Sequence, residues 1–476
     1  MTSPAPDFHP GSFRDPEGRV FFHEGRVFRT LSPKAAERMK RLDADGTFKR
    51  LADQGFLVPT RVVPGAEAGL EPARFEQAVL EQEKLPLITY PYEWSFGLLK
   101  DAALFTLDFL ETALGSGLTL KDATPFNVAL WKNRPVFFDT LSLDIYEEGR
   151  PWDGYSQFCR EFLFPLLLTS TTGIAFQPWL RGELNGLKVQ DLSRLLGYGR
   201  LRRGALTHVH IQAWLERWIA KKGDVDLRQR FNKANFSKAT VLKLIGKLRK
   251  LVRGLRAPSG GTLWAGYEET HSYSAEDDRK KSDFIAAAAE RENVWIDLGC
   301  NKGRYTMVAA KEARLAVGLD LDPCAVDAFY DRIRGTGGTP FYPLVCDLMN
   351  PSPSLGWRLR ERPSLLERVR GDSFLALALV HHLCIGANVP LPEFVALLKT
   401  FGKGGVVEWV DKKDSMVKRL LRNREDVFSD YTWETFCSLL EGDFVVKEVC
   451  ETHGGSRRLC RVTPKAAPQA TPKERP

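Results

Sequence analysis

The carboxyl-terminal part of the chain alternates short apolar runs with longer amphipathic stretches, the pattern of strands and helices that follow one another. The apolar runs with the length of buried strands span residues 294–298, 315–320, 343–348, 373–380 and 406–410. Two further runs, at 444–449 and 458–462, are expected to pair as a final antiparallel hairpin. Because strands that alternate with helices favour a parallel sheet, this part predicts a doubly wound, Rossmann-like α/β domain.

The amino-terminal part has shorter and more mixed patterns. Residues 18–29 carry apolar residues on both sides of Glu24-Gly25 and predict a β-hairpin across these two residues. A helix is expected to run from Pro33 to about Leu42, and residues 97–114 predict a long apolar helix. This mixture of hairpin and helices is typical of an α+β domain.

The chain length of 476 residues suggests two or three domains. Pro, Ser and Gly at 257–261 predict a linker, and the last dozen residues, rich in Pro, Lys and Ala, predict a disordered tail. The expected parts are a flexible amino terminus at 1–14, an α+β domain at 15–200, a basic helical connector at 201–261, the α/β domain at 262–463 and the tail at 464–476.

Composition favours a globular protein of the cytoplasm. Hydrophobic residues make up 43% of the chain and charged residues 27%, as in ordinary globular proteins. No run of eighteen apolar residues is present, so no transmembrane helix is expected, and the first residues do not have the pattern of a signal peptide. The eight cysteines are scattered without a C-x-x-C motif, so we expect neither a zinc site nor disulfides, and a reducing compartment.

The net charge of +8 is unevenly distributed along the chain. Residues 199–256 contain sixteen Lys or Arg against three acids, and residues 241–253 have helical periodicity with a basic face. Such a face can meet nucleic acid, an anionic lipid surface or an acidic substrate. We favour a solvated helix that links two domains, and RNA binding through Lys243, Lys247, Arg249 and Lys250 stays open as an alternative.

The candidate chemistry begins where the first strand of the α/β domain ends. Asp297 is followed by a turn with Gly299 and Gly303, where the backbone can approach a ligand closely because no Cβ intervenes. Asp320 ends the next strand and is placed to accept hydrogen bonds from ribose hydroxyls, and Asp347 follows the third strand, near an adenine amino group. The turn is neither G-x-G-x-x-G nor a Walker motif, which argues against a dinucleotide or a triphosphate.

These motifs resemble those of class I S-adenosylmethionine-dependent methyltransferases over roughly residues 262–463. The resemblance implies that the first motif wraps the methionine part of S-adenosylmethionine, that Asp320 binds ribose and that Asp347 lies by adenine. Asn301 takes the place of the commoner glycine of this motif. The implied cofactor-binding residues are Asp297, Gly299, Cys300, Asn301, Gly303, Asp320, Leu321, Asp347 and Leu348.

Two further positions are candidates for handling the transferred methyl group. His381 and His382 follow the fourth strand, where such methyltransferases place residues that face the methyl, and a histidine can accept a proton near neutral pH. Glu408, which is expected to end the next strand, is a second candidate base. Metal-ligand spacing is not evident, so no metal is expected. The aromatic segment 264–273 precedes the domain, and its Tyr267 and Tyr273 are expected to lie in a lid near the sulfonium.

The amino-terminal part contains a second motif. Asp122, Asn127 and a strand ending in Asp139 have the spacing of a kinase catalytic loop and its metal-binding acid, and Pro125 is similar to aminoglycoside- and choline-kinase-like proteins. The resemblance implies that Asp122 is the base and that Asn127 and Asp139 hold magnesium. No glycine-rich loop precedes the motif, and Thr140-Leu141 replaces the usual Phe-Gly. We therefore expect a kinase-like domain that is inactive as a kinase.

The segments 90–96, 122–127 and 138–142, placed before the methyltransferase-like domain, together resemble bacterial proteins related to rhizobial nodulation host-specificity methyltransferases. The expected function is methyl transfer from S-adenosylmethionine, to an oxygen of a small-molecule or of a glycan- or lipid-like acceptor that the first domain helps to bind. An RNA methyltransferase and a bifunctional kinase–methyltransferase are the alternatives. The sequence reveals neither the acceptor nor the oligomeric state.

Overall fold

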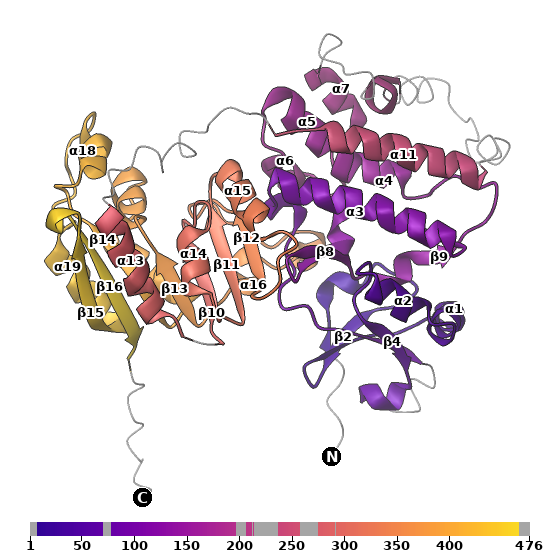
Figure 1. Cartoon of the computed structure of the whole chain (residues 1–476), viewed down its shortest axis with the longest axis horizontal. Helices are drawn as coiled ribbons and strands as arrows, with labels where there is room; N and C mark the ends of the chain where they lie inside the picture. The colour runs from indigo at the N-terminus through magenta and orange to yellow at the C-terminus, as the bar shows by residue number, and fades with distance from the viewer. Residues whose placement is uncertain are drawn as a thin grey trace, which may run out of the picture. The chain divides into compact units, whose positions relative to one another are not determined.

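The computed structural model describes residues 7–69, 78–196, 206–211, 213, 237–257, 275–290 and 292–465 (Figure 1). The chain divides into two compact units. The first comprises residues 1–260 together with 352–364, and the second comprises 261–351 and 365–476. The aromatic segment 264–273, with Tyr267 and Tyr273, lies outside the described residues, so the expected lid stays a prediction.

The first unit begins with an antiparallel sheet in the order β1-β2-β3-β5-β4. Its strands are β1 (Asp7–Phe8), β2 (Val20–His23), β3 (Arg26–Arg29), β4 (Thr60–Val63) and β5 (Val79–Gln82). The hairpin predicted around Glu24-Gly25 is confirmed, because β2 pairs with β3 and both turn residues have positive φ angles. The sheet packs around a small core that includes the stacked rings of Phe21 and Phe28.

Helices and short hairpins complete the first unit. The helix predicted from Pro33 is α1 (Pro33–Ala44), which starts at Pro33 because the Ser32 side chain caps its free N–H groups. The long apolar helix is α3 (Phe96–Gly115), capped by Ser95. The remaining elements are α2 (Thr47–Asp53), β6 (Leu118–Leu120), β7 (Val128–Trp131), β8 (Arg134–Phe137), β9 (Leu143–Ile145), α4 (Tyr155–Phe158), α5 (Phe164–Thr172), α6 (Gln177–Gly182) and α7 (Val189–Leu196).

The basic helix α11 (Lys238–Gly254) packs along α3 in the first unit, as Figure 1 shows. It buries Val241, Ile245, Leu248 and Val252, which recur at helical spacing on one face. Arg249 forms ion pairs with Asp108 and Glu111 of α3. This helix is therefore an integral part of the unit and not a free connector between two domains, because its apolar face needs α3 to exclude water.

The second unit is built on one mixed sheet in the order β12-β11-β10-β13-β14-β16-β15. The parallel strands are β10 (Val294–Leu298), β11 (Leu315–Asp320), β12 (Phe341–Val345), β13 (Ser373–Ala376) and β14 (Gly404–Val410). β15 (Phe444–Thr452) and β16 (Arg457–Pro464) form the predicted antiparallel hairpin at one edge. The doubly wound α/β fold is thus confirmed, with β10, β11 and β12 side by side and their carboxyl ends at one edge.

Helices cover this sheet. α13 (Ala275–Ala288) lies beside α14 (Arg304–Ala309), which contacts β10, and α17 (Leu391–Phe401) lies beside α19 (Trp433–Asp443) and contacts β13. The others are α15 (Pro323–Ile333), α16 (Leu365–Arg368) and α18 (Ser415–Leu421). Each of these helices except α18, which is followed by α19, precedes a strand of the sheet.

Two segments differ in the structure from the predicted division of the chain. Residues 7–12, which we expected to be flexible, form β1 and a short 3₁₀ turn, because Asp7 and Phe8 pair with β2. Residues 352–364 group with the first unit although they lie between two strands of the second in sequence. Within the described residues, no helix is long and apolar enough to cross a membrane.

Candidate functional site

The glycine turn between β10 and α14 has the backbone geometry that its residues predict. Gly299, Asn301 and Gly303 all have left-handed φ angles, of 81°, 48° and 73°. A Cβ at Gly303 would lie 2.2 Å from the Phe329 ring, so no side chain fits there. At Gly299, the one atom of the described residues within 4 Å of a built Cβ is Leu379 Cδ1, at 3.6 Å. The turn therefore offers backbone to a ligand at Gly299 and packs tightly at Gly303.

Asp320, at the end of β11, is tied to this turn. Its Oδ2 accepts a hydrogen bond from the Asn301 backbone N–H at 2.7 Å, and its Oδ1 accepts one from the Asp322 N–H at 2.9 Å. Burial raises the pKa of Asp320 above its ordinary value, and the two N–H groups counteract this shift. A carboxylate offers about four lone-pair sites, so Asp320 keeps capacity for further hydroxyl donors.

Asp297 lies in β10, two residues before Gly299. It is buried, and only one of its two carboxylate oxygens has a hydrogen-bond partner among the described residues. Its Oδ2 accepts a hydrogen bond from the Thr306 hydroxyl at 2.5 Å, while its Oδ1 has no partner among the described residues. Burial raises the pKa of Asp297 to about 7, and the charge of Asp320 adds to the shift. The Asn301 Oδ1 is likewise buried without a hydrogen-bond partner there. Two buried acceptors beside an open turn suit a ligand that brings N–H donors.

The other predicted cofactor residues lie at the same edge but differ in their surroundings. Cys300 is buried and faces β11, since a Cβ on Gly318 would lie 2.8 Å from its Sγ. Leu321 is 55% exposed. Asp347 is half-buried and accepts a hydrogen bond from the Met349 N–H at 2.9 Å, and Leu348 beside it is also half-buried. Cys300 thus packs beneath the turn. Leu321, Asp347 and Leu348 are at least partly exposed at the carboxyl edge of the sheet.

The segment after β13 carries the two candidate histidines. His381 is fully buried and His382 half-buried, and their ring centroids lie 4.1 Å apart. Leu379, two residues earlier, is the neighbour of Gly299 across the turn. His381 is therefore shielded from solvent, whereas His382 keeps part of its surface exposed.

Glu408 does not occupy the position expected of a catalytic base. It is fully buried in β14, its Oε2 lies 2.7 Å from Lys281 Nζ of α13, and the same oxygen accepts a hydrogen bond from the Ala378 N–H at 2.7 Å. Burial pushes the pKa of Glu408 upward, but the charges of Lys281 and Arg457 and the hydrogen bonds from Lys281 and Ala378 together lower it below its ordinary value. Glu408 is therefore enclosed by the protein and favours its ionised form, and its role as a proton acceptor stays an untested prediction.

The sequence reasoning missed Lys281 and Ala378, the two partners of Glu408. Lys281 stands in a highly charged stretch, where a buried lysine is unexpected. The signal was present, because Lys281 shares helical spacing with the buried Phe284, Ile285 and Ala288. Nothing in the sequence indicated the left-handed φ of 49° at Ala378.

The kinase-type motif of the first unit also comes together in space. Asn127 Nδ2 donates to Asp139 Oδ2 at 3.2 Å, and the Ser142 hydroxyl lies 2.6 Å from Asp139 and 3.4 Å from Asp122. Arg29, at the end of β3, forms ion pairs with Asp139 and Asp15. Burial alone would raise the pKa of Asp139, but the Arg29 charge, the hydrogen bonds from Ser142 and Arg29 and the Lys121 charge together lower it below its ordinary value. The motif spacing therefore predicted a real polar cluster, whereas no pattern in the sequence indicated Arg29.

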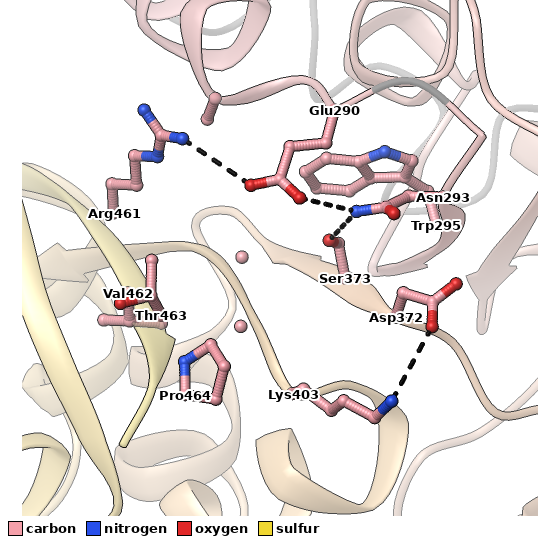
Figure 2. A pocket seen from close by; sticks show the side chains of 13 residues that line it. Glu290, Asn293, Trp295, Asp372, Ser373, Lys403, Arg461, Val462, Thr463 and Pro464 are labelled. Carbon is pink, nitrogen blue, oxygen red and sulfur yellow. Dashed lines mark hydrogen bonds and ion pairs between the residues drawn. The ribbon is translucent and has the colours of Figure 1, made fainter. Parts of the chain in front are cut away.

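A cavity of about 170 Å³ in the second unit lies at the opposite edge of the sheet (Figure 2). It is lined by residues at or near the starts of parallel strands, including Trp295, Ser373 and Gly404. Arg461 and Glu290 lie 3.8 Å apart across it, and Asn293 donates to Ser373 at 3.0 Å (Figure 2). Since ligands of doubly wound folds bind at the carboxyl ends of the strands, this cavity is separate from the site at Asp297 and Asp320. Among the described residues, no group of His, Cys, Asp or Glu is arranged to hold a metal ion.

The chain was compared with known families, proteins and structures. No family model matches it. The nodulation protein NoeA of Rhizobium meliloti (strain 1021) is 39% identical over 446 residues, which cover 92% of this chain and 92% of that protein.

Two solved methyltransferase structures each align with less than half of the chain. The N-methyltransferase NodS of Bradyrhizobium japonicum WM9 aligns with 40% of this chain and 99% of its own, at 12% identity and a TM-score of 0.30. The magnesium protoporphyrin IX methyltransferase ChlM of Synechocystis PCC 6803 aligns with 43% of this chain and 86% of its own, at 14% identity and a TM-score of 0.27. By its nearly full-length match in sequence, this chain belongs to the family of the nodulation protein NoeA.

Proposed function

We propose that this protein is an S-adenosylmethionine-dependent methyltransferase that methylates an oxygen of a small-molecule or a glycan- or lipid-like acceptor. The observation that carries the proposal is the pair of acids at the glycine turn. Asp320 is tied to the turn through the Asn301 N–H, and Asp297 is buried beside it with one oxygen unsatisfied among the described residues. The motif resemblance of these residues to class I methyltransferases supports the same ligand.

The residues present fit S-adenosylmethionine. The unsatisfied Oδ1 atoms of Asp297 and Asn301 match the N–H donors of its amino-acid part. Asp320 has lone pairs left for the two ribose hydroxyls, and the half-buried Asp347 and Leu348 lie at the end of the next strand, where adenine is expected. Leu321, which is exposed after β11, offers apolar surface to the adenosine.

When bound, S-adenosylmethionine supplies an electrophilic methyl group, so the protein has mainly to position an acceptor in line with it. His382 is the residue that we propose accepts the hydroxyl proton on an imidazole nitrogen, because an imidazole can do so near neutral pH. The fully buried His381 supports the ring of His382 through their 4.1 Å contact. The first unit is proposed to bind and orient the acceptor.

Calorimetric titration with S-adenosylmethionine and S-adenosylhomocysteine tests the proposal directly. We expect both ligands to bind in a one-to-one ratio, because the second unit has one such turn among its described residues. Absence of binding by either ligand would refute the proposed function.

All eight cysteines are free thiols in the structure, and we propose the cytoplasm, where thiols stay reduced, as the compartment.

His382→Ala is expected to lower turnover by about 100-fold, the usual contribution of a general base, with little change in cofactor affinity. His381→Ala is expected to act mainly on stability, because it removes a fully buried side chain. The measurement is transfer of a labelled methyl group to an identified acceptor, with thermal unfolding of each variant beside it. Full turnover by both variants would exclude both histidines as the base.

A bifunctional kinase–methyltransferase is a second candidate, favoured by the cluster of Asp122, Asn127 and Asp139. Titration with Mg-ATP decides it. We expect no ATP binding, because Arg29 already neutralises Asp139. ATP binding that Asp139→Asn abolishes, and that the exposed-surface variant Asp53→Asn leaves intact, would instead establish the second activity.

A further inference from the structure

A buried ion pair joins α13 to β14 in the second unit. Lys281 is 2% exposed and Glu408 0%, and Nζ and Oε2 lie 2.7 Å apart. Removing both charges from water is costly, and replacing such a pair by apolar residues is often neutral for stability or even stabilising. Stability alone therefore gives no reason to keep this pair, and its other contacts indicate what it does.

The contacts of Glu408 lead to the loop that faces the glycine turn. Its Oε2 accepts the Ala378 N–H at 2.7 Å, and Ala378 has a left-handed φ of 49°, which residues with a Cβ rarely adopt. Leu379 comes next and is the only neighbour within 4 Å of a Cβ built on Gly299, among the described residues. The hydrogen bond to Glu408 thus holds Ala378 in its strained conformation. The segment with Leu379, His381 and His382 follows directly after Ala378.

The contacts of Lys281 lead to the other side of the same turn. Its Nζ lies 4.8 Å from the centroid of the Tyr305 ring, in the first turn of α14. The Tyr305 hydroxyl donates to Asp278 of α13 at 2.8 Å. The charge of Lys281 also reaches Asp297, whose pKa it lowers against the larger effect of burial. The ion pair thus contacts two segments next to the glycine turn, at Ala378 through Glu408 and at Tyr305 through Lys281.

We propose that Glu408 is a positioning residue, which fixes the Ala378–His382 segment against the glycine turn and so sets the shape of the cofactor site, and that Lys281 is the cation that balances its buried charge. This inference rests on the proposed function. Glu408 acts through the Ala378 backbone and takes no proton from an acceptor.

Two charge-balanced double variants distinguish the effect of the hydrogen bond to the Ala378 N–H from the effect of the two buried charges. Lys281→Met/Glu408→Leu removes both charges and the acceptor for the Ala378 N–H. Lys281→Met/Glu408→Gln removes the charges but keeps an oxygen for that N–H. The chain supplies a matched control in the buried pair of Arg457 and Asp414, 2.8 Å apart and 3% and 4% exposed, which is altered as Arg457→Met/Asp414→Asn.

S-adenosylhomocysteine affinity is measured by calorimetry for all three variants. The leucine variant is expected to bind about tenfold or more weakly than the wild type, and the glutamine variant and the control within about threefold of it. Equal affinity of the leucine variant and the wild type would overturn the inference and leave the proposed function standing. No binding by the wild type would overturn the proposed function, and the inference with it.

Amide hydrogen exchange of the ligand-free proteins keeps the inference testable even if a variant is less stable. We expect faster exchange at residues 378–386 in the leucine variant alone, because only that variant loses the acceptor for Ala378. Exchange in this segment that is as slow as in the wild type would refute the positioning role.

Discussion

Replacing Asp320 with alanine is expected to weaken S-adenosylhomocysteine binding by about 100-fold. The substitution removes the acceptors proposed for the ribose hydroxyls. It also frees the Asn301 N–H, which Asp320 Oδ2 now holds at 2.7 Å, so the turn loses one of its hydrogen bonds to β11. Both losses act on ligand affinity, and the second also loosens the unliganded turn. Calorimetric titration of the variant at pH 8 is the measurement.

Asp331→Ala is the matched control for this experiment. Asp331 lies on α15 and is exposed, with a weak ion pair to Arg334 just after the same helix. The change removes one negative charge from the same unit without touching the turn, so the affinity of this variant should equal that of the wild type. An Asp320→Ala variant that binds as tightly as this control would show that Asp320 does not contact the ligand.

The residues of the glycine turn could be read from the sequence because local chemistry determines them. Gly303 has no room for a Cβ and Gly299 has a left-handed φ, which glycine adopts readily. The two glycines in the sequence therefore predicted the turn. The acids at 320 and 347 followed from the rule that parallel strands end at a common edge, and the strand order confirms that β10, β11 and β12 are neighbours.

Glu408 shows where this reasoning stops. The apolar run around it predicted a strand whose end carries the acid, but β14 continues to Val410 and every residue in it is buried. Which acid faces a ligand depends on which elements cover the strand, here α13 with Lys281 from 127 residues earlier in the chain. Such pairing between distant segments leaves no periodic signal in either of them.

The same limit applies in the first unit. The spacing of Asp122, Asn127 and Asp139 predicted a cluster because all three lie within one short stretch. Arg29 and Asp15 come from the distant amino-terminal region and reach this cluster only through folding. Likewise, no local pattern assigns residues 352–364 to the first unit. Long-range contacts of single side chains were therefore the part that sequence could not supply.

Asp297→Asn is expected to weaken S-adenosylhomocysteine binding and, at the same time, to stabilise the ligand-free protein at neutral and alkaline pH. The pKa of Asp297 is raised to about 7 by burial, and the groups that act on it are Thr306 from α14, Asp320 from β11 and Lys281 from α13. Between about pH 4 and 7 the folded protein therefore holds a proton that the unfolded chain has released. By linkage, the free energy of unfolding falls as the pH rises through this window and is constant above it.

An asparagine does not titrate, so the free energy of unfolding of the variant does not fall in this way as the pH rises. The stability advantage of Asp297→Asn should be small near pH 4, grow up to about pH 7 and stay on the order of 2 kcal/mol above it. Thermal and denaturant unfolding at pH 5 and 8 measure this difference. Asp283→Asn, which changes an exposed acid on α13, is the control and should behave as the wild type at both pH values.

Ligand binding should show the opposite dependence on pH, because the proposed partner of Asp297 is the ammonium group of the ligand and only the carboxylate pairs with it. Wild-type affinity is expected to rise by up to about tenfold per pH unit below pH 7 and to level off above it. The Asp297→Asn variant should bind more weakly above pH 7 and show no such rise. An affinity that is constant from pH 5.5 to 8 in the wild type would mean that Asp297 does not receive the ammonium, and that its burial serves the fold alone.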